Sequence, residues 1–140
     1  MKLGIISVVI LLTLSLCLVA CAPSTGTPID ISCDDFRQQA HMSEQISVAA
    51  GDTFTVTLCS NATTGFEWSE SAQISDPTVV QQTAHEFVGP DTGLVGAPGK
   101  EVWTFKAIKK GTSTIALEYS RPWEGGEKAE WSFTAAVTVK

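Results

Sequence analysis

The segment Thr53-Phe54-Thr55-Val56-Thr57-Leu58-Cys59 carries the clearest structural pattern in this chain. Its apolar side chains alternate with threonines, which is the period of two expected of a β-strand with one buried and one solvated face. Threonine and valine are also β-branched and favour an extended backbone. Gly51-Asp52 supplies a turn directly before the segment. We therefore expect a half-buried strand whose Phe54, Val56 and Leu58 point into a core.

Similar short segments recur on both sides of this strand. Alternating or β-rich residues occupy 29–33, 46–50, 66–69, 78–88, 102–107, 115–119 and 131–139. Turn-forming residues separate them, and helical composition is confined to 34–40, where two early aspartates precede good helix formers. This pattern predicts an all-β fold: an immunoglobulin-like β-sandwich of about seven strands, with one short helix near residues 34–40.

The N-terminal region departs from this pattern. Lys2 is followed by an apolar run over residues 4–16, which is shorter than the ~20 residues that a membrane-spanning helix needs. Such a run indicates a signal peptide. The ending Leu18-Val19-Ala20-Cys21 resembles a bacterial lipobox, which implies cleavage before Cys21 and lipid attachment to its sulfur. We expect a signal peptide over 1–20, a flexible tether over 21–28 and a single domain over 29–140.

This leader also predicts where the mature protein resides. An acylated Cys21 would anchor it to the cell envelope outside the cytoplasm, whereas an unmodified protein would be secreted. Removing residues 1–20 takes away Lys2, which leaves eight basic against fifteen acidic side chains and changes the formal net charge from −6 to −7. An acidic domain disfavours nucleic acid as a partner, because phosphate binding needs a basic surface. We expect a monomer that contacts the membrane through its lipid anchor.

Two cysteines remain in the predicted domain, Cys33 and Cys59. An even pair in an oxidising compartment favours a disulfide over two free thiols. The bridge would stabilise the fold by about 3.5 kcal/mol in the chain-entropy model. Its geometry raises a difficulty, because Cys59 falls on the threonine face of its strand whereas Cys33 has the parity of Ile29 and Ile31. The bridge therefore requires a β-bulge or a position at a sheet edge.

The sequence gives little indication of an enzyme. A catalytic triad needs a nucleophile, a base and an orienting acid close together, and His41 and His85 lie in separate predicted elements without such a cluster. Glu124, Glu127 and Glu130 have the spacing of a solvated edge rather than of a catalytic carboxylate pair. The cysteines and histidines lack the spacing of zinc ligands. We expect no catalytic residue, no metal and no cofactor.

Three irregular segments interrupt the predicted strands. Loop 1, residues 61–66, combines turn formers with stiff threonines. Loop 2, residues 89–99, contains four glycines and two prolines, and loop 3, residues 121–127, begins with Arg121-Pro122-Trp123. Loops that are two strands apart emerge at the same end of a Greek-key sandwich, so we expect these three to lie together. Trp123 would be either a cap over the sandwich end or an anchor for a binding partner.

In order and spacing, these loops resemble the three motifs of the chagasin-like inhibitors of papain-type cysteine peptidases. The resemblance covers the chain from about residue 29 to residue 140. Ala62 stands where the family usually has proline, and Ala97-Pro98 stand where many members have paired glycines. Loss of the proline returns conformational freedom worth up to about 1 kcal/mol to the free loop. The matching segments are Asn61-Ala62-Thr63-Thr64-Gly65-Phe66, Gly96-Ala97-Pro98-Gly99 ahead of Glu101-Val102-Trp103-Thr104-Phe105, and Arg121-Pro122-Trp123.

The resemblance implies a reversible, non-covalent inhibitor whose loops form a wedge in the protease cleft. Thr63 and Thr64 would lie over the catalytic cysteine and histidine of the protease, with Gly65 allowing close backbone approach. Residues 94–99 of loop 2 would line the non-primed side, and Trp123 would pack on the primed side. An alternative is an immunoglobulin-like envelope lipoprotein or adhesin that binds a protein or carbohydrate through the same loops. The predicted binding residues are Asn61, Ala62, Thr63, Thr64, Gly65, Phe66, Leu94, Val95, Gly96, Ala97, Pro98, Gly99, Arg121, Pro122 and Trp123.

Overall fold

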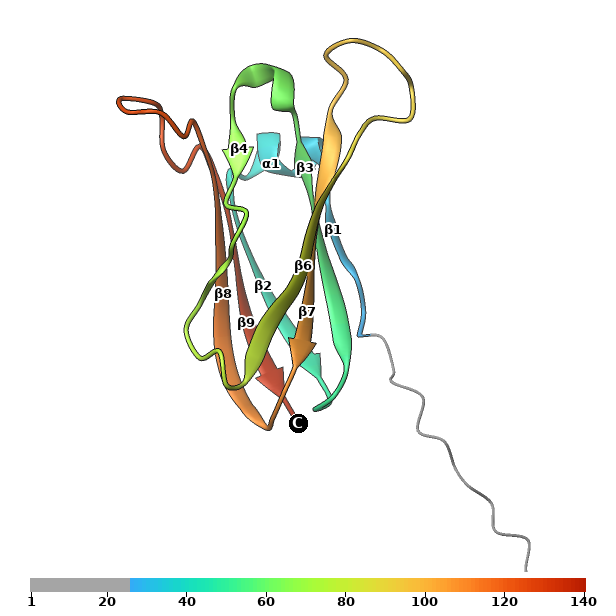
Figure 1. Ribbon diagram of the computed structural model, residues 1–140, viewed down its shortest axis with the longest axis vertical. Helices are drawn as coiled ribbons and strands as arrows, with labels where there is room; N and C mark the ends of the chain where they lie inside the picture. Colours follow the sequence, from blue (N-terminus) through green and yellow to red (C-terminus); the bar gives the residue numbers. More distant parts are fainter. Residues whose placement is uncertain (1–25) are drawn as a thin grey trace, which may run out of the picture.

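The computed structural model describes residues 26–140, which form a sandwich of two β-sheets (Figure 1). The predicted signal peptide, the predicted acylation site Cys21 and the tether up to residue 25 lie outside the described residues. The prediction of an all-β sandwich with one short helix is confirmed. In chain order the elements are β1 (Ile29–Ile31), α1 (Cys33–Gln38), β2 (His41–Val48), β3 (Thr53–Ser60), the 3-10 helix η1 (Ala62–Thr64), β4 (Glu67–Trp68), β5 (Gln73–Ile74), β6 (Val80–Val88), β7 (Gly99–Ala107), β8 (Gly111–Ser120) and β9 (Trp131–Val139).

The two sheets have the strand orders β1-β3-β7-β6 and β2-β9-β8-β4, and β5 also pairs with β8. Most neighbouring strands are antiparallel, but β1 runs parallel to β3 and β2 runs parallel to β9. These parallel pairs arise because the chain starts along the edge of one sheet, crosses through α1 and continues along the edge of the other. The helix α1 therefore lies at one end of the sandwich (Figure 1).

The core follows the predicted alternation of apolar side chains. On β3, Phe54, Val56 and Leu58 are at most 2% exposed, as the sequence predicts. The neighbouring β7 contributes three inward side chains, and β8 and β9 contribute the facing layer. These buried residues are Trp103, Phe105 and Ala107 on β7, Ile115, Leu117 and Tyr119 on β8, and Phe133, Ala135, Val137 and Val139 on β9.

The strand count differs from the prediction, because the described chain contains nine strands rather than about seven. The two-residue strand β5 lies in a polar connection, where hydropathy gives no signal. The strand β2 begins at His41, five residues before the predicted start at residue 46. Its first half has no buried side chain, because β2 is an edge strand held mainly by backbone pairing with β9. Edge strands of this kind need few apolar residues.

The disulfide between Cys33 and Cys59 is present, with 5.1 Å between the two Cα atoms. The strand parity of Cys33 does not prevent this bridge, because Cys33 is the first residue of α1 rather than a residue of β1. The bridge lies beside the edge strand β1, which is one of the two solutions that the sequence allows. A capping box between Ser32 and Asp35 starts the helix, and the hydrogen bonds from Ser32 hold the pKa of Asp35 below its usual value.

The two ends of the sandwich have different structures (Figure 1). Loops 1, 2 and 3 leave the sheets at the end that also carries α1, as predicted for a Greek-key arrangement. The opposite end consists of tighter turns and the end of β9. Gly26 joins the domain near this opposite end, where its amide donates to the carbonyl of Thr53 at 2.7 Å.

Candidate functional site

Loop 1 is a rigid turn organised by Asn61. The Oδ1 atom of Asn61 accepts hydrogen bonds from the amide and hydroxyl of Thr63, at 3.2 and 2.7 Å. Its carbonyl accepts hydrogen bonds from the amide and hydroxyl of Thr64, at 3.1 and 2.7 Å. Gly65 closes η1 with φ 77°, a left-handed conformation that favours glycine. The threonine hydroxyls thus fix the backbone, while Ala62, Thr63 and Thr64 remain exposed to solvent.

Tyr119 on β8 holds loop 1 from below. Its hydroxyl accepts a hydrogen bond from the Asn61 amide at 3.0 Å and donates one to the Asn61 carbonyl at 3.2 Å. Its ring stacks on Phe66, with 5.3 Å between the ring centroids. Phe66 is only 9% exposed. This predicted binding residue therefore supports the loop from inside the domain.

Loop 3 packs against loop 1 through an arginine and a tryptophan. The guanidinium of Arg121 lies 4.5 Å from the centroid of the Phe66 ring and 5.8 Å from that of Trp123, both within cation–π range. Its Nη1 atom donates to Glu127 Oε2 at 2.8 Å. A Cβ atom on Gly65 would lie only 2.8 Å from Cη2 of Trp123. The indole thus lies directly beside the tip of loop 1, and it remains 52% exposed.

Loop 2 is linked to loop 1 by one hydrogen bond and presents apolar side chains. The Asn61 Nδ2 atom donates to the Gly96 carbonyl at 3.2 Å. Leu94 is 68% exposed and Val95 is fully exposed. Gly99 begins β7 in a crowded position, where a Cβ atom would overlap the Val88 carbonyl oxygen. Loop 1 therefore contacts both other loops: Asn61 bonds to loop 2, and Gly65 and Phe66 lie against loop 3.

Comparison with known proteins assigns this arrangement to a family. The family model of the chagasin family peptidase inhibitors I42 matches residues 47–137. The chain belongs to the chagasin family. It is 34% identical to chagasin from Trypanosoma cruzi over 98 residues, which cover 69% of this chain and 89% of chagasin. It is 32% identical to amoebiasin-2 from Entamoeba histolytica over 95 residues, covering 68% and 76% of the two chains.

A solved structure supports the same assignment. The crystal structure of the cysteine protease inhibitor EhICP2 from Entamoeba histolytica matches with a TM-score of 0.59 at 28% identity. The match covers 81% of this chain and 96% of that structure. The predicted resemblance to the chagasin family is thus confirmed, both in sequence and in fold.

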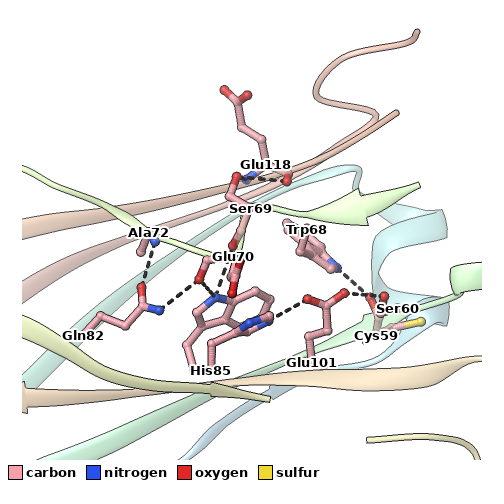
Figure 2. A network of polar contacts seen from close by, with 11 residues as sticks. Cys59, Ser60, Trp68, Ser69, Glu70, Ala72, Gln82, His85, Glu101 and Glu118 are labelled. Carbon is pink, nitrogen blue, oxygen red and sulfur yellow. Dashed lines mark hydrogen bonds and ion pairs between the residues drawn. The ribbon is translucent and has the colours of Figure 1, made fainter. Parts of the chain in front are cut away.

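In this chagasin-family domain, a buried polar network joins the bases of loops 1 and 2 (Figure 2). Ser60, directly before loop 1, donates its hydroxyl to Glu101 Oε1 at 2.7 Å. The other carboxylate oxygen of Glu101, which follows loop 2, lies 2.8 Å from His85 Nε2 on β6. Glu101 is 7% exposed, and a buried carboxylate is stable only with such partners. The network therefore ties together the ends of β3, β6 and β7.

A second set of contacts in the same region fastens one sheet to the other (Figure 2). Gln82 on β6 accepts from the Ala72 amide at 2.8 Å and donates to the Glu70 carbonyl at 2.9 Å. Trp103 on β7 donates through Nε1 to the Ser69 and Glu70 carbonyls, each at 3.2 Å. These bonds hold the segment after loop 1 against the opposite sheet.

The Ser60–Glu101–His85 network does not have the geometry of a catalytic triad. Its carboxylate lies between the serine and the histidine, whereas a triad places the histidine between the nucleophile and the acid. Within residues 26–140, no group of three or more His, Cys, Asp or Glu side chains is arranged to hold a metal ion. No helix in this part of the chain is long and apolar enough to cross a membrane.

The structure brings the predicted binding residues of all three loops to one end of the sandwich (Figure 1). Sequence reasoning missed the residues that position them, above all Tyr119, Glu101 and His85. The sequence places Tyr119 in the β-rich segment 115–119 and His85 in the segment 78–88, without a role for either side chain. One signal was available for Glu101, because a charged residue that shares the strand parity of Trp103 and Phe105 is expected to be buried and paired.

Proposed function

We propose that this protein is a reversible, tight-binding inhibitor of papain-type cysteine peptidases whose three loops enter the active-site cleft together. The observation that carries the proposal is the connected loop surface. Asn61 bonds to both loop 1 and loop 2, and Trp123 packs against Gly65. The chain also belongs to a family of peptidase inhibitors.

Loop 1 would act as the central element of the wedge. Thr63 and Thr64 are exposed at its tip and would lie over the catalytic cysteine and histidine of the peptidase. A protease cleaves a peptide that it binds in an extended conformation, but η1 bends the backbone of residues 62–64 into a 3-10 turn. The hydrogen bonds of Asn61 hold this turn closed. Loop 1 would therefore fill the cleft without presenting a cleavable bond.

Loops 2 and 3 would extend the contact on either side. Leu94 and Val95 offer exposed apolar side chains for the non-primed side, and Trp123 offers half of its indole surface for the primed side. Because the loops are fixed to a rigid sandwich, they lose little conformational entropy on binding. A standard interface of roughly 1,600 Å² in total is expected.

Titration of active papain with the purified protein tests this function. Stoichiometric loss of hydrolysis, with full activity recovered after dilution or competition, is the expected result. No inhibition at micromolar concentration would contradict the proposal and would leave a binding module for another protein or a carbohydrate. Incubation for several hours followed by mass spectrometry should recover an uncleaved loop 1.

We further propose that the mature protein is a monomer, acylated at Cys21 and held on the outer side of a cell membrane. Support comes from the lipobox-like ending Leu18-Val19-Ala20-Cys21. Metabolic labelling of expressing bacteria with an alkyne-tagged fatty acid should mark the wild-type protein and not the Cys21→Ser variant. Equal labelling of both, or labelling of neither, would refute acylation at this residue. Light scattering of the detergent-solubilised protein would test the monomer.

A further inference from the structure

The end of the sandwich opposite the loops is here termed the base (Figure 1). It consists of the turns 49–52, 75–79 and 108–110, the end of β7 from Lys106, and the end of β9. Backbone hydrogen bonds join these parts: Gly51 donates to Ala107 at 2.8 Å, Ile108 to Val79 at 2.8 Å and Lys140 to Val48 at 2.9 Å. The charged residues at the base are Lys106, Lys109, Lys110, Lys140, Asp52 and Asp76.

The base has the opposite charge to the rest of the domain. Its four lysines and two aspartates give a formal charge of +2, whereas the remaining four basic and thirteen acidic side chains of residues 26–140 give −9. The four lysines are all exposed. The carboxylate of Asp76 is already engaged by the amide and hydroxyl of Thr78, at 2.9 and 2.6 Å.

The partners of the basic side chains show the same division. Away from the base, Arg37, Lys100 and Arg121 form ion pairs, and Lys128 donates to backbone carbonyls. Within residues 26–140, none of the four base lysines forms an ion pair or a side-chain hydrogen bond. Ile108 lies among them and is 40% exposed. The base thus presents four exposed lysines around one apolar side chain. One of them, Lys109, adds to the hydrogen bonds from Thr78 in lowering the pKa of the Asp76 carboxyl.

The N-terminal segment also joins the domain near the base. Gly26 is bonded to Thr53, and a Cβ atom on Gly26 would lie 3.0 Å from Cγ1 of Val48. The five residues that follow Cys21 can span at most about 18 Å. The long strands of the two sheets separate the base from the loops by about 30 Å. An anchor at Cys21 would therefore place the base, and not the loops, next to the bilayer.

We propose that the base is a membrane-facing surface that docks on anionic lipid headgroups and directs the three loops away from the bilayer. Lysines close to an anionic surface each strengthen binding about fivefold, and the effect acts within a Debye length of ~8 Å. The acidic remainder of the domain is repelled by the same surface. Attraction at one end and repulsion at the other therefore select one orientation. This inference rests on the proposed lipid anchor at Cys21 and does not depend on the identity of the inhibited peptidase.

Lysine footprinting of the full-length chain in vesicles tests the orientation. The protein is reconstituted into phosphatidylglycerol–phosphatidylcholine vesicles or into phosphatidylcholine vesicles and treated with a membrane-impermeant amine reagent. We expect the four base lysines to react at least threefold less in the anionic vesicles, with reactivity restored by 0.5 M NaCl. Lys100 and Lys128, near the loop end, should react equally in both. Equal reactivity of the base lysines in the two vesicles, or protection of Lys100 and Lys128 instead, would overturn the proposal.

A pair of charge-matched variants completes the test. Lys110→Glu should restore the reactivity of the remaining base lysines in anionic vesicles, whereas Lys100→Glu should leave their protection intact. The same loss in both variants would indicate a general effect of net charge and would contradict a specific surface. Lys110→Glu should inhibit papain as well as the wild type does. If the wild-type protein fails to inhibit papain, the proposed function fails while the footprint remains a test of the base.

Discussion

At the scale of single residues, substitution of Trp123 tests whether this side chain is a binding anchor or a structural cap. Its indole is 52% exposed in the free protein and contacts Gly65 at the tip of loop 1. We expect Trp123→Ala to weaken peptidase binding by about 2 to 4 kcal/mol, as is typical of an interface tryptophan. The domain should stay folded and lose no more than roughly 2 kcal/mol of its free energy of unfolding, since about half of the side chain is already solvated. Inhibition kinetics and urea denaturation measure the two quantities. An unfolded variant would identify Trp123 as a cap.

Ala62 gives a second prediction for a single residue, in the opposite direction. It is the first residue of η1, its amide makes no hydrogen bond within residues 26–140, and Asn61 before it is extended at φ −123° and ψ 92°. A proline suits this position, because only an unused donor is lost, the first position of a helical turn favours proline, and the preceding residue is already extended. Ala62→Pro should stabilise the domain by about 0.4 to 1 kcal/mol and tighten inhibition up to about fivefold. Thermal unfolding and inhibition constants test both effects. Weaker inhibition would show that loop 1 must adjust on binding.

At the scale of strands and loops, the buried Glu101 couples the bases of loops 1 and 2. Glu101→Ala would leave the Ser60 hydroxyl and the His85 ring without their partner. The free energy of unfolding should fall by roughly 1 to 3 kcal/mol. Glu101→Gln should lose less, because the amide oxygen can still accept from Ser60. Inhibition by Glu101→Ala should weaken through faster dissociation, since the loops themselves are unchanged. An unaltered dissociation rate would show that the loops are positioned independently of the network.

The strands and loops also show which parts of the fold the sequence predicts and which parts it does not. Alternating apolar residues predicted β3, β7, β8 and β9 because these strands each bury one face. The edge strand β6 has a weaker pattern, and its register shifts at a bulge between Gln82 and Ala84. Contacts between loops, such as Asn61 with Gly96, depend on the relative positions of distant segments, which no local pattern encodes. The motifs therefore predicted that the three loops lie together at one end of the sandwich. The residues that hold the loops in place became visible only in the fold.

At the scale of the whole molecule, the disulfide joins the start of α1 to the end of β3, next to loop 1. The closed segment has a sequence separation of 26 residues. Loss of the disulfide should lower the free energy of unfolding by about 3.5 kcal/mol, mainly through the entropy of the unfolded chain. We expect this loss in the Cys33→Ala/Cys59→Ala variant by urea denaturation. Wild-type protein unfolded in the presence of a reductant is the matched control, because it loses the bond but keeps both side chains.

The native contacts of loop 1 do not involve the bridge directly: Asn61 is held by Tyr119, and Ser60 by Glu101. Reduction should therefore lower stability while leaving the inhibition constant for papain within about twofold at temperatures where the domain stays folded. This separation matters in practice, since a cysteine peptidase is assayed in a reductant that keeps its own thiol active. A large loss of inhibition in the reduced but folded protein, established by circular dichroism in the same buffer, would show that the bridge also positions loop 1.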